Sequence, residues 1–479
     1  MSELHQIRPS SRARAAGLRP PAPVPRLKNM GPIALLKALR TNPIECWTRK
    51  HFEEPIVLGG FAFGRVAVVS DPPAIRQILV EKTADYKKSK LQNRVLSVAL
   101  KNGLLTVEGD QWRGQRRTIA PQFGKKTVMR LAPHMVDAGN AMIWRWREGG
   151  EGHVFELMTE LSRLTLDALV RTIFADGLGN DAEAMRLAMV TYFETTGRID
   201  PFDIMGLPDA IPRITRWKVR PQLRFFDQSV SALIATRKRK IAETPDAVPQ
   251  DLLTILLTAK DPETGEPMGE PEVKANILTF IAAGHETTAN ALTWAVYLLC
   301  QSPEWYERLT VEADRELDGP LDTLADRLIE TRAVIDEAMR LYPPIVGITR
   351  TAGKEDEVAG KTIRRGTLMV VSPWVLHRHQ LLWDDPDLFD PDRFLEGPGK
   401  RMERYAYLPF GIGPRMCIGA AFALQEATIV LAMLMRNFTL RMEPGQTVWP
   451  LQMITLRPKD PLMMTARSRQ PNLVAAILA

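Results

Sequence analysis

The segment FGIGPRMCIG, residues 410–419, decides how the rest of the chain is interpreted. Gly411 and Gly413 require a tight loop before Cys417, and the apolar pattern that follows predicts a helix. A cysteine at a helix N-terminus faces unpaired N–H groups and the positive end of the helix dipole, and Arg415 adds positive charge beside it. These surroundings favour a thiolate, which can bind a metal. The glycines leave room for a flat ligand against the backbone, so we predict a cofactor-binding loop.

Upstream of this loop, the sequence predicts one very long helix. Nothing breaks the helical pattern between Pro271 and Pro303, which allows about 30 residues or roughly 45 Å. A helix of this length crosses a whole domain, so we expect one large domain over residues 41–470 rather than three smaller ones. Residues 1–40 are predicted to form a flexible basic arm, and residues 471–479 a short tail.

The middle of the long helix contains a group of polar residues, Ala283-Gly-His-Glu-Thr-Thr288. Gly284 has no side chain and can leave space for a small ligand, while the Glu286 acid and the Thr287 hydroxyl can relay protons. Glycine and threonine are also common where two helices pack, so this pattern alone leaves both interpretations open. We interpret His285 as a neighbour of the site and not as a metal ligand.

A third pattern places an acid and a guanidinium on one helix face, at Glu337 and Arg340. The spacing by itself is weak evidence, because the tetrapeptide Glu-Ala-Met-Arg also occurs at Glu183–Arg186. Only Glu337 is followed by a Leu-Tyr-Pro-Pro segment and lies 80 residues before Cys417. We therefore single out this pair and not the others.

Short strands are expected in two pairs. The first runs from Pro55 to Val69 and turns at Gly59-Gly60, and the second joins residues 362–364 to residues 368–371 through a turn at Arg365-Gly366. The remaining chain from about residue 110 to 345 is mainly helical in pattern, with a last helix over about 418–437. The expected fold is mostly helix with one small sheet.

Together these segments resemble the cytochrome P450 family. Residues 410–419 match its haem-loop pattern Phe-x-x-Gly-x-Arg-x-Cys-x-Gly, and the polar group on the long helix resembles its oxygen-activation motif. Glu337 and Arg340, with Arg393 as third member, resemble its structural salt bridge. The resemblance covers roughly residues 45–465. It implies a mainly α fold with a small β region, in which a long central helix lies over the haem beside one main small sheet.

The resemblance also implies the cofactor, haem b, and the residues that hold it. Cys417 is the implied axial ligand of the haem iron, and such a thiolate favours O–O cleavage. Trp112 and Arg116 resemble the family's Trp-x-x-x-Arg helix, where both face a propionate. Arg350 matches a position that contacts the other propionate in many members of the family, although a solvated charge on a strand is the alternative. His377 is not included among the implied haem contacts. The implied cofactor-binding residues are Cys417, Arg415, Arg116, Trp112, Arg350, Phe410, Gly411 and Gly413.

The activity implied by the resemblance is monooxygenation, in which one atom of O2 enters a small apolar substrate. Gly284, Glu286 and Thr287 are the implied catalytic residues. Two alternatives remain: a peroxygenase or isomerase of the same fold, and a non-catalytic haem or gas-binding protein. Such relatives do not need the acid and alcohol that Glu286 and Thr287 provide, so we favour the monooxygenase.

Electrons must come from a separate protein, because no flavin- or nicotinamide-binding pattern is present. We expect an acidic ferredoxin or flavodoxin, with its reductase, to dock by charge near Cys417. The basic residues expected to receive it are Arg113, Arg117, Lys125, Lys126, Lys400, Arg401 and Arg404.

Segments that line the substrate pocket in the family are apolar in this chain. This suits a lipid, fatty acid or terpenoid-like substrate, although ordinary core packing explains some of these residues as well. The expected lining residues are Ile345, Val346, Gly347, Ile348, Leu451, Gln452, Met453, Ile454, Phe202, Ile204 and Met205.

Composition excludes several other classes of protein. The chain has 479 residues, of which 45% are hydrophobic and 25% charged, as in ordinary globular proteins. Residues 1–40 contain eight basic residues and one acid, which accounts for the whole net charge of +7, so the remainder predicts no nucleic-acid partner. No apolar run approaches the ~20 residues of a spanning helix, and three distant cysteines indicate no disulfide framework. We expect a monomer in the cytoplasm; the Arg-rich leader leaves a mitochondrial location as the alternative.

Overall fold

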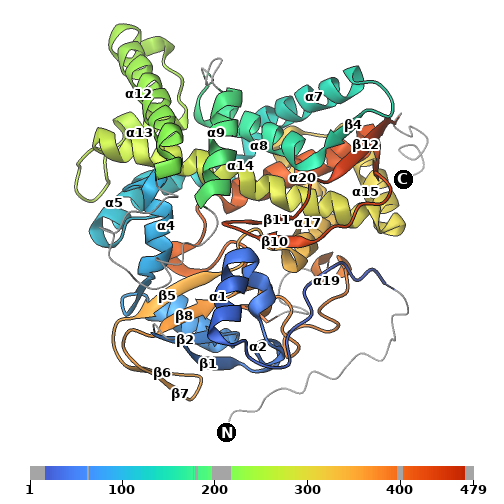
Figure 1. The fold of residues 1–479 in the computed structure, drawn as a ribbon. Coiled ribbons are helices and arrows are strands. Elements are labelled where there is room, and N and C mark those ends of the chain that lie inside the picture. Colours follow the sequence, from blue (N-terminus) through green and yellow to red (C-terminus); the bar gives the residue numbers. More distant parts are fainter. Residues whose placement is uncertain are drawn as a thin grey trace.

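We describe a computed structural model of the chain, which covers residues 17–61, 64–175, 177, 182–196, 217–395 and 403–469. Helices make up most of the molecule, and small sheets lie at its margins (Figure 1). No helix within these ranges is long and apolar enough to cross a membrane. The helices are α1 (Pro32–Thr41), α2 (Arg49–Glu53), α3 (Pro72–Arg76), α4 (Lys90–Leu100), α5 (Gly109–Ile119), α6 (Lys125–Met129), α7 (Ala132–Glu148), α8 (Leu157–Ile173), α9 (Ala182–Thr196), α12 (Arg220–Glu243), α13 (Leu252–Thr258), α14 (Glu270–Cys300), α15 (Pro303–Glu316), α16 (Leu324–Arg327), α17 (Ile329–Leu341), α18 (Pro373–Leu376), α19 (Asp392–Leu395) and α20 (Ala420–Asn437).

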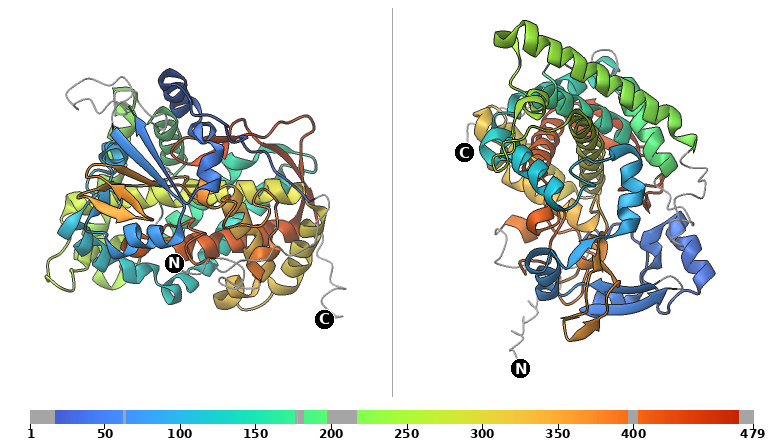
Figure 2. Two further views of the ribbon diagram at one scale, coloured as in Figure 1. Left: turned by 90° about the horizontal axis from the view of Figure 1, so that it is seen from below. Right: turned by 90° about the vertical axis from the view of Figure 1, so that its left-hand side faces the viewer.

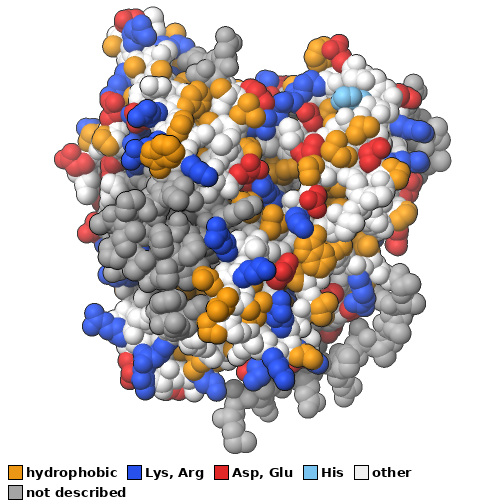
Figure 3. All heavy atoms as spheres, viewed as in Figure 1, with side chains coloured by type: hydrophobic (Ala, Val, Ile, Leu, Met, Phe, Trp, Pro, Cys, Tyr) orange, Lys and Arg blue, Asp and Glu red, His pale blue; other side chains and the backbone are white. Residues whose placement is uncertain are grey.

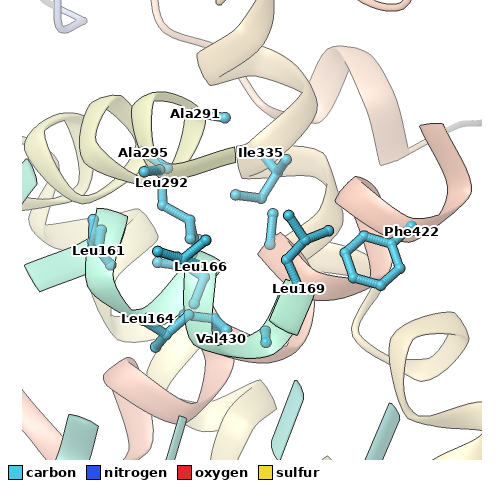
Figure 4. Close-up of a cluster of buried hydrophobic side chains, with 14 of the residues drawn as sticks. Leu161, Leu164, Leu166, Leu169, Ala291, Leu292, Ala295, Ile335, Phe422 and Val430 are labelled. Carbon is cyan, nitrogen blue, oxygen red and sulfur yellow. The ribbon is translucent and has the colours of Figure 1, made fainter. Parts of the chain in front are cut away.

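The long helix α14 crosses the interior of the molecule with 31 residues, as the sequence predicts. Helices α8, α17 and α20 pack around it. Figure 4 shows Leu161 and Leu169 of α8 in one buried cluster with Leu292 of α14, Ile335 of α17 and Val430 of α20. Burying one such side chain is worth about 1.5–3 kcal/mol. This packing fixes the position from which α14 presents its polar residues.

The main sheet has five strands in the order β1-β2-β8-β5-β3. It lies at the opposite end of the molecule from α7 and α12 (Figure 1). Smaller sheets join β4 and β9 to β12, β6 to β7, and β10 to β11. The strands are β1 (Ile56–Phe61), β2 (Gly64–Val69), β3 (Tyr86–Lys88), β4 (Val154–Glu156), β5 (Ile348–Ala352), β6 (Asp356–Val358), β7 (Lys361–Ile363), β8 (Leu368–Val371), β9 (Phe438–Met442), β10 (Pro450–Gln452), β11 (Leu456–Pro458) and β12 (Met463–Ser468).

Two details of the predicted strands are wrong. Gly59 and Gly60 do not form a turn but continue β1, where they pair with Val66 and Arg65. The predicted partners β7 and β8 do not pair with each other: β7 pairs with β6, and β8 pairs antiparallel with β5 and parallel with β2. The apolar β8 takes a central position between two non-local strands, and a pattern of neighbouring residues does not record such pairing.

The N-terminal segment also differs from the predicted flexible arm. Residues 17–40 pack on the body of the protein, where the carbonyl oxygens of Leu18 and Pro21 accept hydrogen bonds of 2.9 and 2.8 Å. Five prolines in this segment restrict its backbone in advance, which lowers the entropy lost on docking. Residues 1–16 and the predicted tail, 471–479, lie outside the described residues.

Candidate functional site

Cys417 lies in a closed loop directly before α20. Its backbone N–H donates to the carbonyl oxygen of Phe410 at 2.9 Å. Gly411 and Gly413 have φ angles of +68° and +75°, which favour glycine. A Cβ atom on Gly413 would lie 2.1 Å from the carbonyl oxygen of Leu79. Close contact with this backbone, rather than space for a flat ligand, is therefore what Gly413 provides.

The Cys417 thiol is accessible although protein surrounds it. Its side chain is exposed to solvent, and yet burial by the surrounding protein raises its pKa. The N–H of Gly419 and the charge of Arg116 lower this pKa without offsetting the burial. The sequence predicted surroundings that favour the thiolate, whereas burial favours the neutral thiol. A cation bound to sulfur would stabilise the thiolate.

A haem iron fits this thiol better than a bare metal ion does. Among the residues that the structure describes, no group of three or more His, Cys, Asp and Glu side chains could hold a metal. Iron in a macrocycle brings four ligands with it and needs a single protein ligand on one side. One accessible cysteine, Cys417, could provide this ligand.

Helix α14 exposes a short strip in the middle of an otherwise buried stretch. Ala283 is exposed and Thr287 is half-buried, whereas His285 and Glu286 are buried. The Thr287 hydroxyl donates to the carbonyl oxygen of Ala283 at 2.7 Å. Ala283 is the most open residue of this strip, and the sequence pattern did not single it out because alanine carries no chemistry of its own.

The two residues between Ala283 and Glu286 contribute to helix packing. A Cβ atom on Gly284 would lie 3.0 Å from both methyl carbons of Leu169, so the glycine lets α8 approach α14. The His285 Nδ1 atom lies 2.6 Å from the carbonyl oxygen of Ile281, and burial lowers its pKa to about 4. Helix packing, the interpretation that the sequence left open, therefore accounts for Gly284.

Glu286 turns its carboxyl group toward the C-terminal hairpin of β10 and β11. Its Oε1 accepts a 2.7 Å hydrogen bond from the hydroxyl of Thr455, which in turn accepts one from Asn290 at 3.2 Å. Burial raises the pKa of Glu286. No hydrogen bond within the described ranges joins Glu286 to Thr287. The acid and the alcohol are neighbours in sequence, and Thr455 is a partner that the sequence did not reveal.

Four cations gather around a single carboxylate beside the Cys417 loop. Arg415 binds Glu108 at 2.8 Å and lies over the ring of Trp112 at 3.9 Å. Burial, together with the charges of Arg415 and Arg350, lowers the pKa of Lys88 to about 7. Burial also lowers the pKa of Arg350. We name these residues the cation cluster: Lys88, Arg116, Arg350 and Arg415, with Glu108 as the acid.

The cation cluster fits the two propionates of a haem. Arg116 interacts electrostatically with Cys417, which places the cluster next to the thiol. A cluster with a surplus of buried positive charge is costly without anions, and two carboxylates would balance it. Lys88 and Glu108 were missed by the sequence analysis, since a lysine in a short strand and a glutamate before a helix have no distinguishing pattern.

Glu337, Arg340 and Arg393 form a second cluster, in which Asp390 is a further acid, 3.9 Å from Arg393. Arg340 donates to both Glu337 oxygens at 2.6 and 2.7 Å and to three backbone carbonyl oxygens, and both side chains are fully buried. Arg393 approaches Glu337 at 3.6 Å. Nearby, the buried His377 accepts a hydrogen bond of 2.9 Å from the N–H of Leu408. This cluster joins α17 to the chain that leads to the Cys417 loop.

The remaining predicted residues are dispersed. Three of the cations expected to receive an electron donor already pair with acids of this chain: Arg113 with Asp110, Arg117 with Asp261 and Glu263, and Lys125 with Asp326. The residues expected to line the pocket, 345–348 and 451–454, are mostly half-buried. The other predicted residues, Phe202, Ile204, Met205, Lys400 and Arg401, lie outside the described residues.

Comparison with known proteins agrees with this geometry. Pentalenene oxygenase of Streptomyces avermitilis is 32% identical over 407 residues, which cover 84% of this chain and 87% of that protein. Cyclooctatin synthase of Streptomyces melanosporofaciens is 32% identical over 403 residues, which cover 83% of this chain and 85% of that protein. The solved haem domain of a mutant cytochrome P450DA matches with a TM-score of 0.78 at 25% identity, over 87% of this chain and 91% of that one. The sequence profile of cytochrome P450 matches residues 20–466, and the chain therefore belongs to the cytochrome P450 family.

Proposed function

We propose that Cys417 binds the iron of haem b and that the enzyme oxidises an apolar, terpenoid-like substrate. As a member of its family the chain is a haem b monooxygenase. The observation that carries the proposal is the accessible Cys417 thiol next to the cation cluster. The other two cysteines, Cys46 and Cys300, are half-buried, and burial raises their pKa values to about 11 and about 12.

The protein's residues would divide the work around the cofactor. When bound, haem supplies the redox chemistry that activates O2 for insertion into the substrate. Arg116, Arg350 and Lys88 would hold the propionates and thereby set the orientation of the ring. Thr287 presents a hydroxyl on the open strip of α14, where it can pass a proton. Burial raises the pKa of Glu286, which favours the protonated form of this carboxyl group.

Two observations support a terpenoid-like substrate. The relatives pentalenene oxygenase and cyclooctatin synthase have names that refer to terpenoid chemistry. Ile345, Ile348 and Ile454 are half-buried apolar residues on segments that flank Arg350 and the Glu286–Thr455 bond. A cavity with such a lining binds a hydrocarbon through its area and orients it through few polar contacts.

A separate acidic ferredoxin or flavodoxin is the proposed electron donor. Among the described cations that we predicted for its docking, Lys126 and Arg404 are the two that form no ion pair with another described residue. The charge available for docking is thus smaller than the sequence indicated. We expect the rate of reduction to fall with increasing salt and to fall further in the Lys126→Glu variant. A rate that does not depend on salt would contradict docking by charge.

The test of the function is the absorption spectrum of the reduced protein with carbon monoxide. Wild-type protein should give the strongly red-shifted Soret band of a thiolate–iron–carbonyl complex. Cys417→Ser should lose this band, whereas Cys300→Ser is the matched control and should keep it. A red-shifted band in Cys417→Ser would show that another residue binds the iron. Product formation from terpene hydrocarbons, but not from polar analogues, would test the substrate class separately.

A further inference from the structure

The N-terminal segment of the described chain carries apolar side chains that the body of the protein leaves uncovered. Val24, Leu27 and Ile33 are 86%, 80% and 87% exposed. Helix α1 has the sequence PIALLKALRT, and within this fully described helix Ala38 is the only buried residue. A short helix this rich in apolar residues ordinarily buries them. Leu35, Leu36 and Leu39 are only half-buried, so the described chain leaves much of this apolar face uncovered.

Positive charge accompanies the apolar residues. Between residues 17 and 44 there are five basic residues and no acid. Arg19 pairs with Asp385, and Arg26 donates to a backbone carbonyl. The other three are exposed: Lys28, Lys37 and Arg40. We name residues 24–40 the N-terminal surface.

The N-terminal surface projects from the molecule. Helix α1 stands out from the body in both views of Figure 2. In Figure 3 the part of the face over which α1 lies carries Lys and Arg side chains beside hydrophobic ones. The base of this surface is attached to the body by two backbone hydrogen bonds. The N–H of Arg26 donates to the carbonyl oxygen of Trp47 at 3.1 Å, and the N–H of Arg49 donates to the carbonyl oxygen of Arg26 at 2.8 Å. A partner that binds this surface would therefore be attached to the body of the enzyme.

We propose that the N-terminal surface docks on an anionic phospholipid bilayer, with α1 lying in the plane of the headgroups. Leucine and isoleucine side chains would enter the boundary between headgroups and acyl chains, and the lysine and arginine side chains would reach the phosphates. Each basic residue near the anionic surface strengthens the attraction between the protein and the bilayer. This activity is additional to monooxygenation and does not depend on the substrate.

Charge favours lipid over a second copy of the chain. A symmetric dimer through this surface would bring two sets of uncompensated cations together, because the surface has no acid to pair with them. Scattered apolar residues interleaved with lysines also lack the central pocket of a protein interface. An anionic bilayer satisfies both the apolar and the charged groups at the same time.

The experiment uses full-length, haem-loaded protein and co-flotation with vesicles. Vesicles of phosphatidylcholine alone are compared with vesicles that contain about 25% phosphatidylglycerol. We expect binding to the anionic vesicles at least about tenfold tighter than to the neutral ones, and at least about tenfold weaker at high salt than at low salt. The double variants Lys28→Glu/Lys37→Glu and Leu27→Ser/Ile33→Ser should each reduce binding about tenfold or more.

Matched controls are available on other faces of the molecule. Lys260→Glu changes another exposed lysine, and Val311→Ser changes an apolar residue of α15 that is 42% exposed; neither should alter binding. Equal binding to both kinds of vesicle, or no binding, would overturn the proposal. So would loss of binding on deletion of residues 2–16 with no loss in the two double variants. Self-association that Leu27→Ser/Ile33→Ser abolishes would instead assign the surface to a second copy.

Discussion

The two arginine clusters of this protein differ in the number of acceptors that the chain itself supplies. Arg340 finds five acceptors, namely the two oxygens of Glu337 and three backbone carbonyl groups. The cation cluster has one carboxylate, Glu108, for four basic residues. Arg350, although buried, donates to the carbonyl oxygen of the preceding residue. Arg340 is thus fully paired by groups of the chain, whereas the cation cluster has more basic groups than acids among the described residues.

This difference separates stability from function. A buried charge with all its partners holds the fold together, and removal of one partner leaves the other uncompensated. A buried cation without partners costs stability in the free chain, and the cost is recovered when an anionic ligand binds. The Glu337 cluster should therefore govern folding with or without haem, whereas the cation cluster should govern the difference between the two states.

The largest expected effect is at Glu337. Glu337→Gln leaves the fully buried Arg340 without its counter-charge, so we expect a loss of about 3–5 kcal/mol in the free energy of unfolding, in haem-free and haem-loaded protein alike. Urea unfolding followed by tryptophan fluorescence measures it. If the variant does not fold, Arg393→Lys gives a milder test, because Arg393 lies 3.6 Å from Glu337 and is not its main partner.

The chain supplies a matched control for this substitution. Glu183 and Arg186 occupy the same tetrapeptide and make hydrogen bonds of 2.7 and 3.0 Å, but the Glu183 side chain is 47% exposed. Because water compensates an exposed charge, Glu183→Gln should cost about 1 kcal/mol or less. Equal losses at Glu183 and Glu337 would contradict the idea that burial and complete pairing set the two apart.

Sequence patterns indicated those parts of the site whose residues are close together in the chain. The Cys417 loop, the helix α14 and the Glu337–Arg340 pair each lie within one local segment, where spacing determines which residues face each other. The family resemblance then fixed the mainly helical fold. Gly284 shows the limit of such reasoning, since its position in the motif did not reveal that Leu169 packs against it.

Parts that depend on distant segments could not be predicted in this way. Lys88, Glu108 and Thr455 come from a short strand and from loops, and only the folded chain brings them to the site. The same holds for the pairing of β8 with β2 and β5 and for the docking of residues 17–40. These features rest on tertiary contacts, which leave no periodic trace in the sequence.

The next largest effect is expected at Arg350. Arg350→Leu removes a buried cation that makes no direct ion pair among the described residues, so haem-free protein should be as stable as the wild type or slightly more stable. Haem retention should weaken by about 1.5–3 kcal/mol, or roughly 10- to 100-fold, through loss of a charge-assisted bond. Transfer of haem to apomyoglobin measures this loss. Unchanged haem retention together with a destabilised haem-free chain would place Arg350 with the structural cluster instead.

A smaller effect concerns the pH dependence of stability. The pKa of Lys88 is lowered to about 7 in the fold, below its unfolded value of 10.5. Between these values the unfolded chain binds more protons, so the stability of haem-free protein should rise with pH above about 7, by at most about 1.4 kcal/mol per pH unit. Lys88→Met should remove this rise. In haem-loaded protein, propionates beside Lys88 would keep it charged, and the rise should disappear there as well.

The smallest expected effect compares two tryptophans, one beside each cluster. The Trp383 indole N–H donates to the carbonyl oxygen of Leu376 at 3.1 Å, whereas no acceptor for the Trp112 N–H is present among the described residues. Trp383→Phe should therefore cost about 1 kcal/mol in both haem-free and haem-loaded protein. Trp112→Phe keeps an aromatic ring under Arg415 and should cost about 0.5 kcal/mol or less without haem. A further loss of about 0.5–1 kcal/mol should appear only with haem bound, because only then does its N–H find a partner. Equal costs of Trp112→Phe in the two states would mean that the cation cluster, like the Glu337 cluster, is complete without the cofactor.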